Sequence, residues 1–279
     1  LMDMKTRQSK LLTDAEQLDP GSLAIHPTGR GFLQFDGTRL IETPFAAGKV
    51  REIYRLPAGV EKLPGVYYND DGQNAAFVVK KAGRYQLQVL HLQRGTPTTL
   101  IESPAEIRDP LPRPRHNSLV FSSDGAIWMI DTDGRHHRRL QLAEGDTPQV
   151  RWSAGGRALQ YLNRPLDLKK PTSLREFVPE SGEDTRIADT TNFVRFQANA
   201  DSSAFVGVSG SKASPYLLLL VRSGKRELAL AEHRSSNPAI VNPLFAPNSQ
   251  FAVFGSDRHG KPAIYSIAME KLVSETDGT

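Results

Sequence analysis

The sequence contains no cysteine among its 279 residues. Disulfide bonds, thiolate metal sites and cysteine nucleophiles are therefore excluded. Long apolar runs are also missing: the longest, YLLLLV at 216–221, is far shorter than the roughly 20 residues needed to cross a bilayer. We therefore predict a soluble protein without a membrane span.

A strong charge of one sign is likewise missing. The 35 Lys and Arg residues nearly balance the 31 Asp and Glu residues, leaving a net charge of +4 and a pI near 9.3. This mild excess favours an acidic partner. RNP, zinc-finger and helix-turn-helix patterns do not occur, so no nucleic-acid partner is predicted.

The chain begins LMDMKTRQSK, without a basic and apolar leader. Because it starts with Leu, we expect the natural N-terminus to lie upstream. The absence of cysteine and the basic pI favour a periplasmic or other extracytoplasmic location, although cysteine absence also suits the cytosol.

A repeated unit runs through the chain. PLFAPNSQFAVFGSDRHGKPAIYSI at 243–267 reads as an apolar strand, a small turn, a second strand, a charged hairpin and a third strand. Similar units occur at 23–45, 65–92, 118–142, from 149, and at 193–221. Turn centres near Gly29, Asp71, Gly156, Asp201 and Ser249, with one weaker copy, recur about every 42–48 residues, the period of a four-stranded propeller blade.

This period predicts an all-β fold, a single β-propeller domain over 1–279. Six complete repeats are expected, together with a partial blade at 1–13 that would make seven blades when intact. The predicted blades span about 21–63, 64–107, 108–146, 147–193, 194–241 and 242–275. A β-sandwich with many hairpins is the alternative, but a sandwich would not need a constant period.

The last repeat resembles the blades of TolB-like propellers. The matching residues are Ala246, Pro247, Asn248 and Ser249 in the turn, Ser256, Asp257, Arg258 and Gly260 in the hairpin, and Ile264 and Tyr265 in the third strand. This resemblance implies the blade type and nearly nothing about function.

A narrower resemblance covers most of the chain. The segments LLTDAEQLDP, REIYRLPAGV and EHRSSNPAIVNPLFAP are similar to oligogalacturonate lyases. That resemblance implies a seven-bladed propeller that cleaves unsaturated pectin fragments by β-elimination with manganese. It also implies metal ligands in a pattern like QxxHxHP, which the shared Pro243 places on Asn237, Ile240 and Asn242. Both histidines are absent, so we predict no cofactor, with manganese bound only if the site is rebuilt from other residues.

Basic residues are expected on the loops around the channel mouth. These loops join successive blades or join the second and third strands of a blade. The predicted ligand-binding residues are Arg113, Arg115 and His116 between blades, Lys169 and Lys170, His233, and Arg258 and His259. Clustered arginines suit the carboxylates of uronic acids. The alternative interpretation is that these are solvated loop charges.

His233 and His116 are the candidates for any catalysis. His233 could act as a ligand or a general base, or it could be a hydrogen-bonded structural residue at a strand end. The adjacent His136 and His137 should point to opposite sides of a strand and could not chelate one metal.

Three functional hypotheses follow. The first is a monomeric propeller that binds an acidic, uronic-acid oligosaccharide and has lost the lyase site. The second is a TolB-like scaffold that binds a protein partner without enzymatic activity. The third is a lyase or hydrolase with a site rearranged around His233 and His116.

Overall fold

The computed structural model describes residues 8, 11–12, 22–46, 48–247 and 249–269. Within these residues the chain is built from β-strands and a 3-10 helix at Pro238–Ile240, so the all-β prediction is confirmed. No helix in this part of the chain is long and apolar enough to cross a membrane. The predicted partial blade at 1–13 lies almost entirely outside the described residues.

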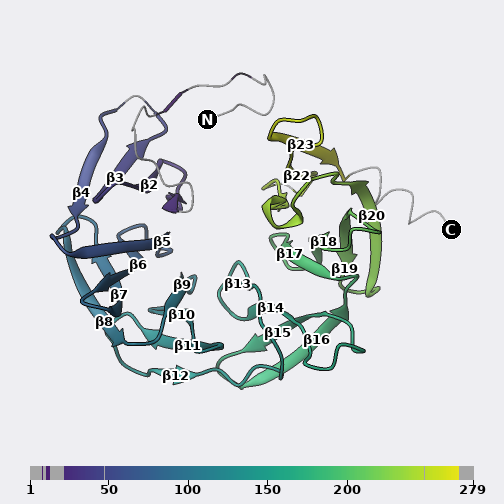
Figure 1. Ribbon diagram of the computed structural model, residues 1–279, viewed down its shortest axis with the longest axis horizontal. Coiled ribbons are helices and arrows are strands. Elements are labelled where there is room, and N and C mark those ends of the chain that lie inside the picture. Colours follow the sequence, from purple (N-terminus) through teal and green to yellow (C-terminus); the bar gives the residue numbers. More distant parts are fainter. Residues whose placement is uncertain (1–7, 9–10, 13–21, 47, 248, 270–279) are drawn as a thin grey trace. The chain divides into compact units, whose positions relative to one another are not determined.

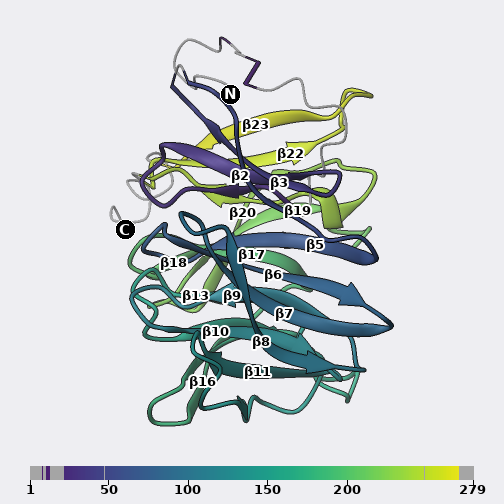
Figure 2. The ribbon, with the colours of Figure 1, turned by 90° about the vertical axis from the view of Figure 1, so that its left-hand side faces the viewer.

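The strands divide between two compact units, residues 1–140 and 141–279. In the first unit, each sheet is a four-stranded antiparallel meander in sequence order. Figure 1 labels all of these strands except the first, and Figure 2 shows β5 to β8 side by side. Their bounds are β1 (Ala24–Ile25), β2 (Gly31–Asp36), β3 (Arg39–Pro44) and β4 (Arg51–Arg55); β5 (Val60–Tyr68), β6 (Asn74–Lys81), β7 (Arg84–His91) and β8 (Thr96–Ser103); and β9 (Ile107–Pro112), β10 (Ser118–Ser123), β11 (Ala126–Asp131) and β12 (Arg138–Arg139).

The second unit contains two further four-stranded meanders and a sheet with three described strands. Their bounds are β13 (Val150–Trp152), β14 (Leu159–Asn163), β15 (Ser173–Val178) and β16 (Glu183–Asp189); β17 (Phe193–Ala198), β18 (Ala204–Ser209), β19 (Tyr216–Val221) and β20 (Arg226–Glu232); and β21 (Leu244–Phe245), β22 (Phe251–Ser256) and β23 (Ala263–Ala268). A sequential antiparallel meander is the topology of a propeller blade.

The turn between the first and second strands is built in the same way in all six described sheets. The amide of the first turn residue donates to the carbonyl five residues later, and its own carbonyl accepts from the amide three residues later. The first turn residues are His26, Asn69, Arg113, Ser153, Asn199 and Ala246. Each turn contains a left-handed residue: Gly29, Gly72, Gly156, Ser202 and Ser249 are the fourth residue of their turns, whereas Arg115 is the third residue of its turn. The repeated backbone pattern is the physical basis of the sequence period, because tight turns with positive φ select Gly, Asn, Asp and Ser.

Apolar side chains fill the space between successive sheets within each unit. Leu33 and Phe35 of β2 pack against Phe77 of β6, and the Phe35 and Phe77 rings meet edge to face at 5.7 Å. In the second unit, Phe196 and Phe205 belong to the cluster that lies between the sheet β13–β16 and the sheet β17–β20. Strands β2, β6, β14 and β18 are almost wholly buried. β6 and β18 lie in the middle sheet of their unit, and their alternating side chains pack into the clusters on the two faces of that sheet.

Polar side chains, one of them the buried Gln149, connect the sheets of the second unit. The Gln149 amide donates to the carbonyl of Phe196 (3.2 Å) and accepts from its N–H (2.8 Å). Arg222 forms two hydrogen bonds of 3.0 Å with the Glu176 carboxylate. These contacts join β13–β16 to β17–β20 by hydrogen bonds as well as by apolar packing.

Candidate functional site

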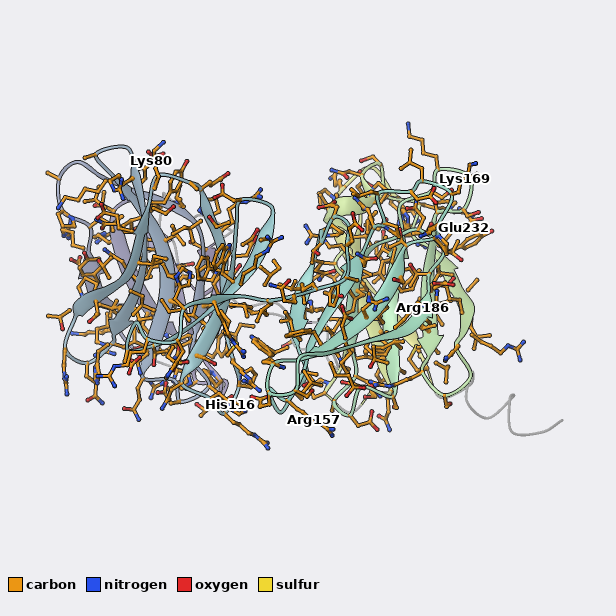
Figure 3. All side chains as sticks on the ribbon, turned by 90° about the horizontal axis from the view of Figure 1, so that it is seen from below. Lys80, His116, Arg157, Lys169, Arg186 and Glu232 are labelled. Atoms are coloured by element: carbon orange, nitrogen blue, oxygen red, sulfur yellow. The ribbon has the colours of Figure 1, made fainter. Side chains whose placement is uncertain are left out.

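Each sheet has two ends with different loops. We call the end with the turn between the first and second strands the first-turn end, and the opposite end the second-turn end. Connections between successive sheets also lie at the second-turn end, because a four-stranded meander returns there. In Figure 3, Lys80 and His116 lie at opposite ends of the first unit, whereas Lys169 and Glu232 lie at the same end of the second unit, opposite Arg157.

The predicted placement of Arg113, Arg115 and His116 between blades is wrong. They belong to the turn from β9 to β10, at the first-turn end of their sheet. Arg113 is only 3% exposed, whereas Arg115 and His116 are exposed. The Arg115 N–H donates to Asp70 in the equivalent turn of the preceding sheet. The error arose because RPRHN has no glycine, so its turn chemistry was not recognisable from sequence.

Lys169 and Lys170 lie where a loop was expected, between β14 and β15 at the second-turn end. Both side chains are exposed. Asp167 orders the tip of this loop: its carboxylate accepts the Lys169 N–H (3.0 Å) and its carbonyl accepts the Lys170 N–H (3.0 Å). The loop therefore presents two cations on a locally ordered turn.

His233 is completely buried where the chain leaves β20. Its N–H donates to Pro215, its carbonyl accepts from the Ser256 hydroxyl (2.6 Å), and Nδ1 accepts the Ser235 N–H (3.0 Å). Nε2 has no hydrogen-bond partner of normal geometry among the described residues. Burial lowers the pKa of His233, and the charge of Arg258 lowers it further, while the backbone of Ser209 partly opposes them. These contacts hold His233 in the interior, which is the arrangement of a structural histidine.

Arg258 and His259 follow β22 in the hairpin to β23. The Arg258 guanidinium lies over the Tyr265 ring (4.7 Å to the centroid) and over Phe254 (5.6 Å), and it donates to the Glu232 carbonyl. His259 is exposed and its Nδ1 lies 2.8 Å from the Tyr265 hydroxyl. Because two aromatic rings and the Glu232 carbonyl already contact the Arg258 guanidinium, His259 is the more accessible of the two residues.

The segment that the lyase resemblance associates with metal lies beside this hairpin. Asp257 accepts hydrogen bonds from the Ser236 N–H (2.9 Å) and hydroxyl (2.5 Å), which fixes the start of the segment. Ile240 is 52% exposed and Asn242 is exposed. Across the described residues, no group of three or more His, Asp or Glu side chains is arranged to hold a metal ion.

A pocket at the first-turn end of the first unit was not predicted. It has a volume of about 270 Å³ and lies between the first strands of the three sheets. Tyr67, Tyr68 and Asp70 line it from β5 and its turn, and Pro27 and Pro114 line it from the neighbouring turns. The tyrosine pair in YYNDDG was the available signal, but strand aromatics are usually core residues. His136 and His137 were expected on a strand, but they lie in the connection before β12. His136 lies 2.6 Å from Asp131, and the His137 ring lies against Phe121 and Trp128.

Comparison with known proteins identifies the fold. No family model matches the chain. It is 25% identical to the oligogalacturonide lyase of Pectobacterium atrosepticum, over 95% of this chain and 81% of the relative. The solved structure of an oligogalacturonate lyase in complex with manganese superposes with a TM-score of 0.91 at 20% identity, covering 98% of this chain and 83% of that one.

More distant structures share the architecture. The β-propeller domain of Cps50 from Myceliophteria thermophila gives a TM-score of 0.68 at 14% identity, over 96% of this chain and 90% of that one. TolB from Acinetobacter baumannii gives 0.59 at 15% identity, over 89% of this chain and 60% of that one. The chain is therefore an oligogalacturonate lyase-like, TolB-like β-propeller.

Proposed function

We propose that this protein binds acidic, uronate-containing oligosaccharides and does not perform manganese-dependent elimination at residues 237–242. The likeness to a protein named oligogalacturonide lyase over 95% of the chain supports the ligand class. The side chains at the three positions that the resemblance associates with metal support the absence of this chemistry.

Ile240 is the observation that carries the proposal. Its hydrocarbon side chain has no donor atom, and Asn237 and Asn242 offer only neutral amide oxygens. Manganese takes about six oxygen ligands in an octahedral arrangement, so two neutral amide oxygens supply too few ligands and no negative charge to hold it. The carboxylate of Asp257, which contacts this segment, accepts hydrogen bonds from Ser236. No elimination step is therefore assigned to these residues.

The exposed lysines at the second-turn end of the second unit supply charge for an acidic sugar. Lys169 and Lys170 project from a turn that Asp167 orders. Because the loop backbone is already ordered in the free protein, less conformational entropy is lost when a ligand binds. Charge-assisted hydrogen bonds from cationic side chains to carboxylates are stronger than neutral ones. Each uronate residue provides one such carboxylate.

The test separates binding from catalysis. The purified protein is titrated calorimetrically with digalacturonate in the presence of a chelator, and separately incubated with digalacturonate and manganese while ultraviolet absorbance reports an unsaturated product. We expect binding without product. The double variant Lys169→Gln/Lys170→Gln should weaken binding by at least about tenfold, because it removes two cations that pair with carboxylates.

The matched control removes two exposed cations from the other end of the same unit. Arg157 lies opposite Lys169 in Figure 3, and Lys225 lies in the turn between β19 and β20. The variant Arg157→Gln/Lys225→Gln should bind as the parent does. Product formation with stoichiometric manganese, or the absence of digalacturonate binding, contradicts the proposal.

A protein-binding scaffold is the second candidate, favoured by two leucines on the same loop. Leu166 is 72% exposed and Leu168 is 97% exposed, immediately before Lys169 and Lys170. Exposed apolar side chains beside cations suit a partner with an apolar hollow and acidic rim. A Leu166→Ser/Leu168→Ser variant that retains digalacturonate binding but loses a protein partner would favour this function.

A further inference from the structure

A second pocket, of about 250 Å³, gathers cationic side chains on the first sheet of the first unit. Its lining residues are Arg30, Gly31, Glu42, Pro44, Lys49 and Arg51. They come from the β1–β2 turn, the paired strands β2 and β3, the connection to β4, and the start of β4. Three cations from separate segments therefore converge on one hollow with a single carboxylate.

Glu42 positions the two arginines. Its Oε2 accepts from Arg51 Nη2 (2.8 Å), and its Oε1 accepts from Arg30 Nη2 (3.4 Å) and from the Tyr68 hydroxyl (3.4 Å). The Glu42 side chain is only 15% exposed. Burial raises the pKa of Glu42, but the hydrogen bond from Arg51 and the charges of Arg51 and Arg30 outweigh burial and lower it. Glu42 therefore stays ionised and holds both guanidinium groups at the pocket.

Most of the donor capacity of this cluster is unused. A guanidinium has five N–H donors, and Arg30 and Arg51 form no side-chain hydrogen bond within the described residues except with Glu42. In the same part of the chain, Lys49 forms no side-chain hydrogen bond or ion pair that offsets its charge. Three cations and one carboxylate leave a local charge of +2.

A pair on the same strand shows how an ordinary surface ion pair differs. Arg55 donates from Nε (3.0 Å) and Nη2 (2.7 Å) to the two oxygens of Glu52, so one cation is matched by one anion. Arg55 lines neither of the pockets described above. By comparison, the Glu42 cluster has two unmatched cations and a hollow beside them.

We propose that the Arg30–Lys49–Arg51 pocket binds a small ligand with at least two negative charges, carried as carboxylate or phosphate groups. Guanidinium groups form paired hydrogen bonds with both types of oxyanion. The pocket is smaller than the roughly 300–1,000 Å³ typical of sites for drug-sized ligands, which limits the bound portion to about one sugar acid or one phosphate-bearing group. This inference does not rest on the proposed function, because its residues lie in the other unit from Lys169 and Lys170.

The test uses inorganic phosphate and digalacturonate as separate calorimetric titrants of the full chain at low ionic strength. At least one should bind. Arg51→Gln should weaken that binding by at least about tenfold, whereas Arg55→Gln, an equally exposed arginine of the same strand with its own glutamate, should change it by less than about twofold. Lys49→Gln should also weaken binding, and it leaves the Arg30–Glu42–Arg51 contacts in place, so its effect is not a loss of that network.

The two titrants identify the source of the oxyanion. Phosphate binding that is lost in Arg51→Gln supports a phosphate-class site, and digalacturonate binding lost in the same variant supports a sugar-acid site. The inference is overturned if neither titrant binds, or if Arg51→Gln and Arg55→Gln have equal effects. Digalacturonate binding that depends on Lys169 and Lys170 but not on Arg51 or Lys49, without phosphate binding, overturns this inference alone and leaves the proposed function standing.

Discussion

Gln149 offers a direct test of how successive sheets of the second unit are joined. Its side chain is 8% exposed and forms both hydrogen bonds that a peptide group would form with Phe196. Phe196 lies in β17, an edge strand of its sheet, and Gln149 bonds both its N–H and its carbonyl. The Gln149 amide thus replaces a missing neighbouring strand at this point.

Replacing Gln149 with Ala should lower the free energy of unfolding by about 2–4 kcal/mol. The change leaves the buried N–H and carbonyl of Phe196 without partners, and each unsatisfied group costs about 1–3 kcal/mol. The two groups are adjacent, so their costs are not expected to add fully. Loss of the side-chain packing of Gln149 acts in the same direction.

Urea denaturation followed by circular dichroism measures this change. Gln73→Ala is the control, because Gln73 is exposed in the β5–β6 turn and such substitutions usually change stability by less than about 0.5 kcal/mol. A loss below about 0.5 kcal/mol for Gln149→Ala, equal to that of the control, would refute the bridging account. Leu has a side-chain volume similar to that of Gln but cannot form these hydrogen bonds. An equal loss of unfolding free energy in Gln149→Leu would therefore assign the effect to the hydrogen bonds rather than to side-chain volume.

Two further predictions concern the same unit. Because burial lowers the pKa of His233 in the folded protein, the unfolded chain binds more protons below pH about 6.5, and the unfolding free energy should fall as pH decreases through that range. His233→Gln should reduce this slope in pH-dependent urea titrations, whereas Gln73→Ala, which changes no ionisable group, should leave it unchanged. Gly207→Ala would place a Cβ 2.1 Å from a ring carbon of the buried Phe193 and should destabilise the fold by at least about 1–3 kcal/mol, whereas Gly224→Ala, whose nearest neighbour would be 3.8 Å away, should cost less than about 0.5 kcal/mol in the same denaturation assay. An unchanged slope in His233→Gln, or equal stabilities for the two glycine variants, would contradict these arguments.

The blade architecture could be predicted from local sequence because it rests on local chemistry. Alternation of apolar strands with turns that contain Gly29, Gly72 or Gly156 specifies a meander, since left-handed turn residues favour glycine. The one repeat that was hard to place has Arg115 at the left-handed position of its first turn. Arg does not favour the left-handed conformation. At this turn the Arg115 N–H donates a hydrogen bond to Asp70 of the preceding sheet, a tertiary contact that the local residue types do not reveal.

The candidate sites could be predicted only in part. Sequence determined which residues carry charge, and it placed Lys169, Lys170 and His259 on exposed loops, because polar segments between strands are solvated. The burial of His233, the stacking of Arg258 on Tyr265 and the convergence of Arg30, Lys49 and Arg51 around Glu42 were decided by tertiary structure. Apart from Ser235, two positions from His233, and Phe254, four positions from Arg258, their partners lie at least 7 positions away in the chain. Burial and electrostatic contact depend on distances in space that no local pattern encodes.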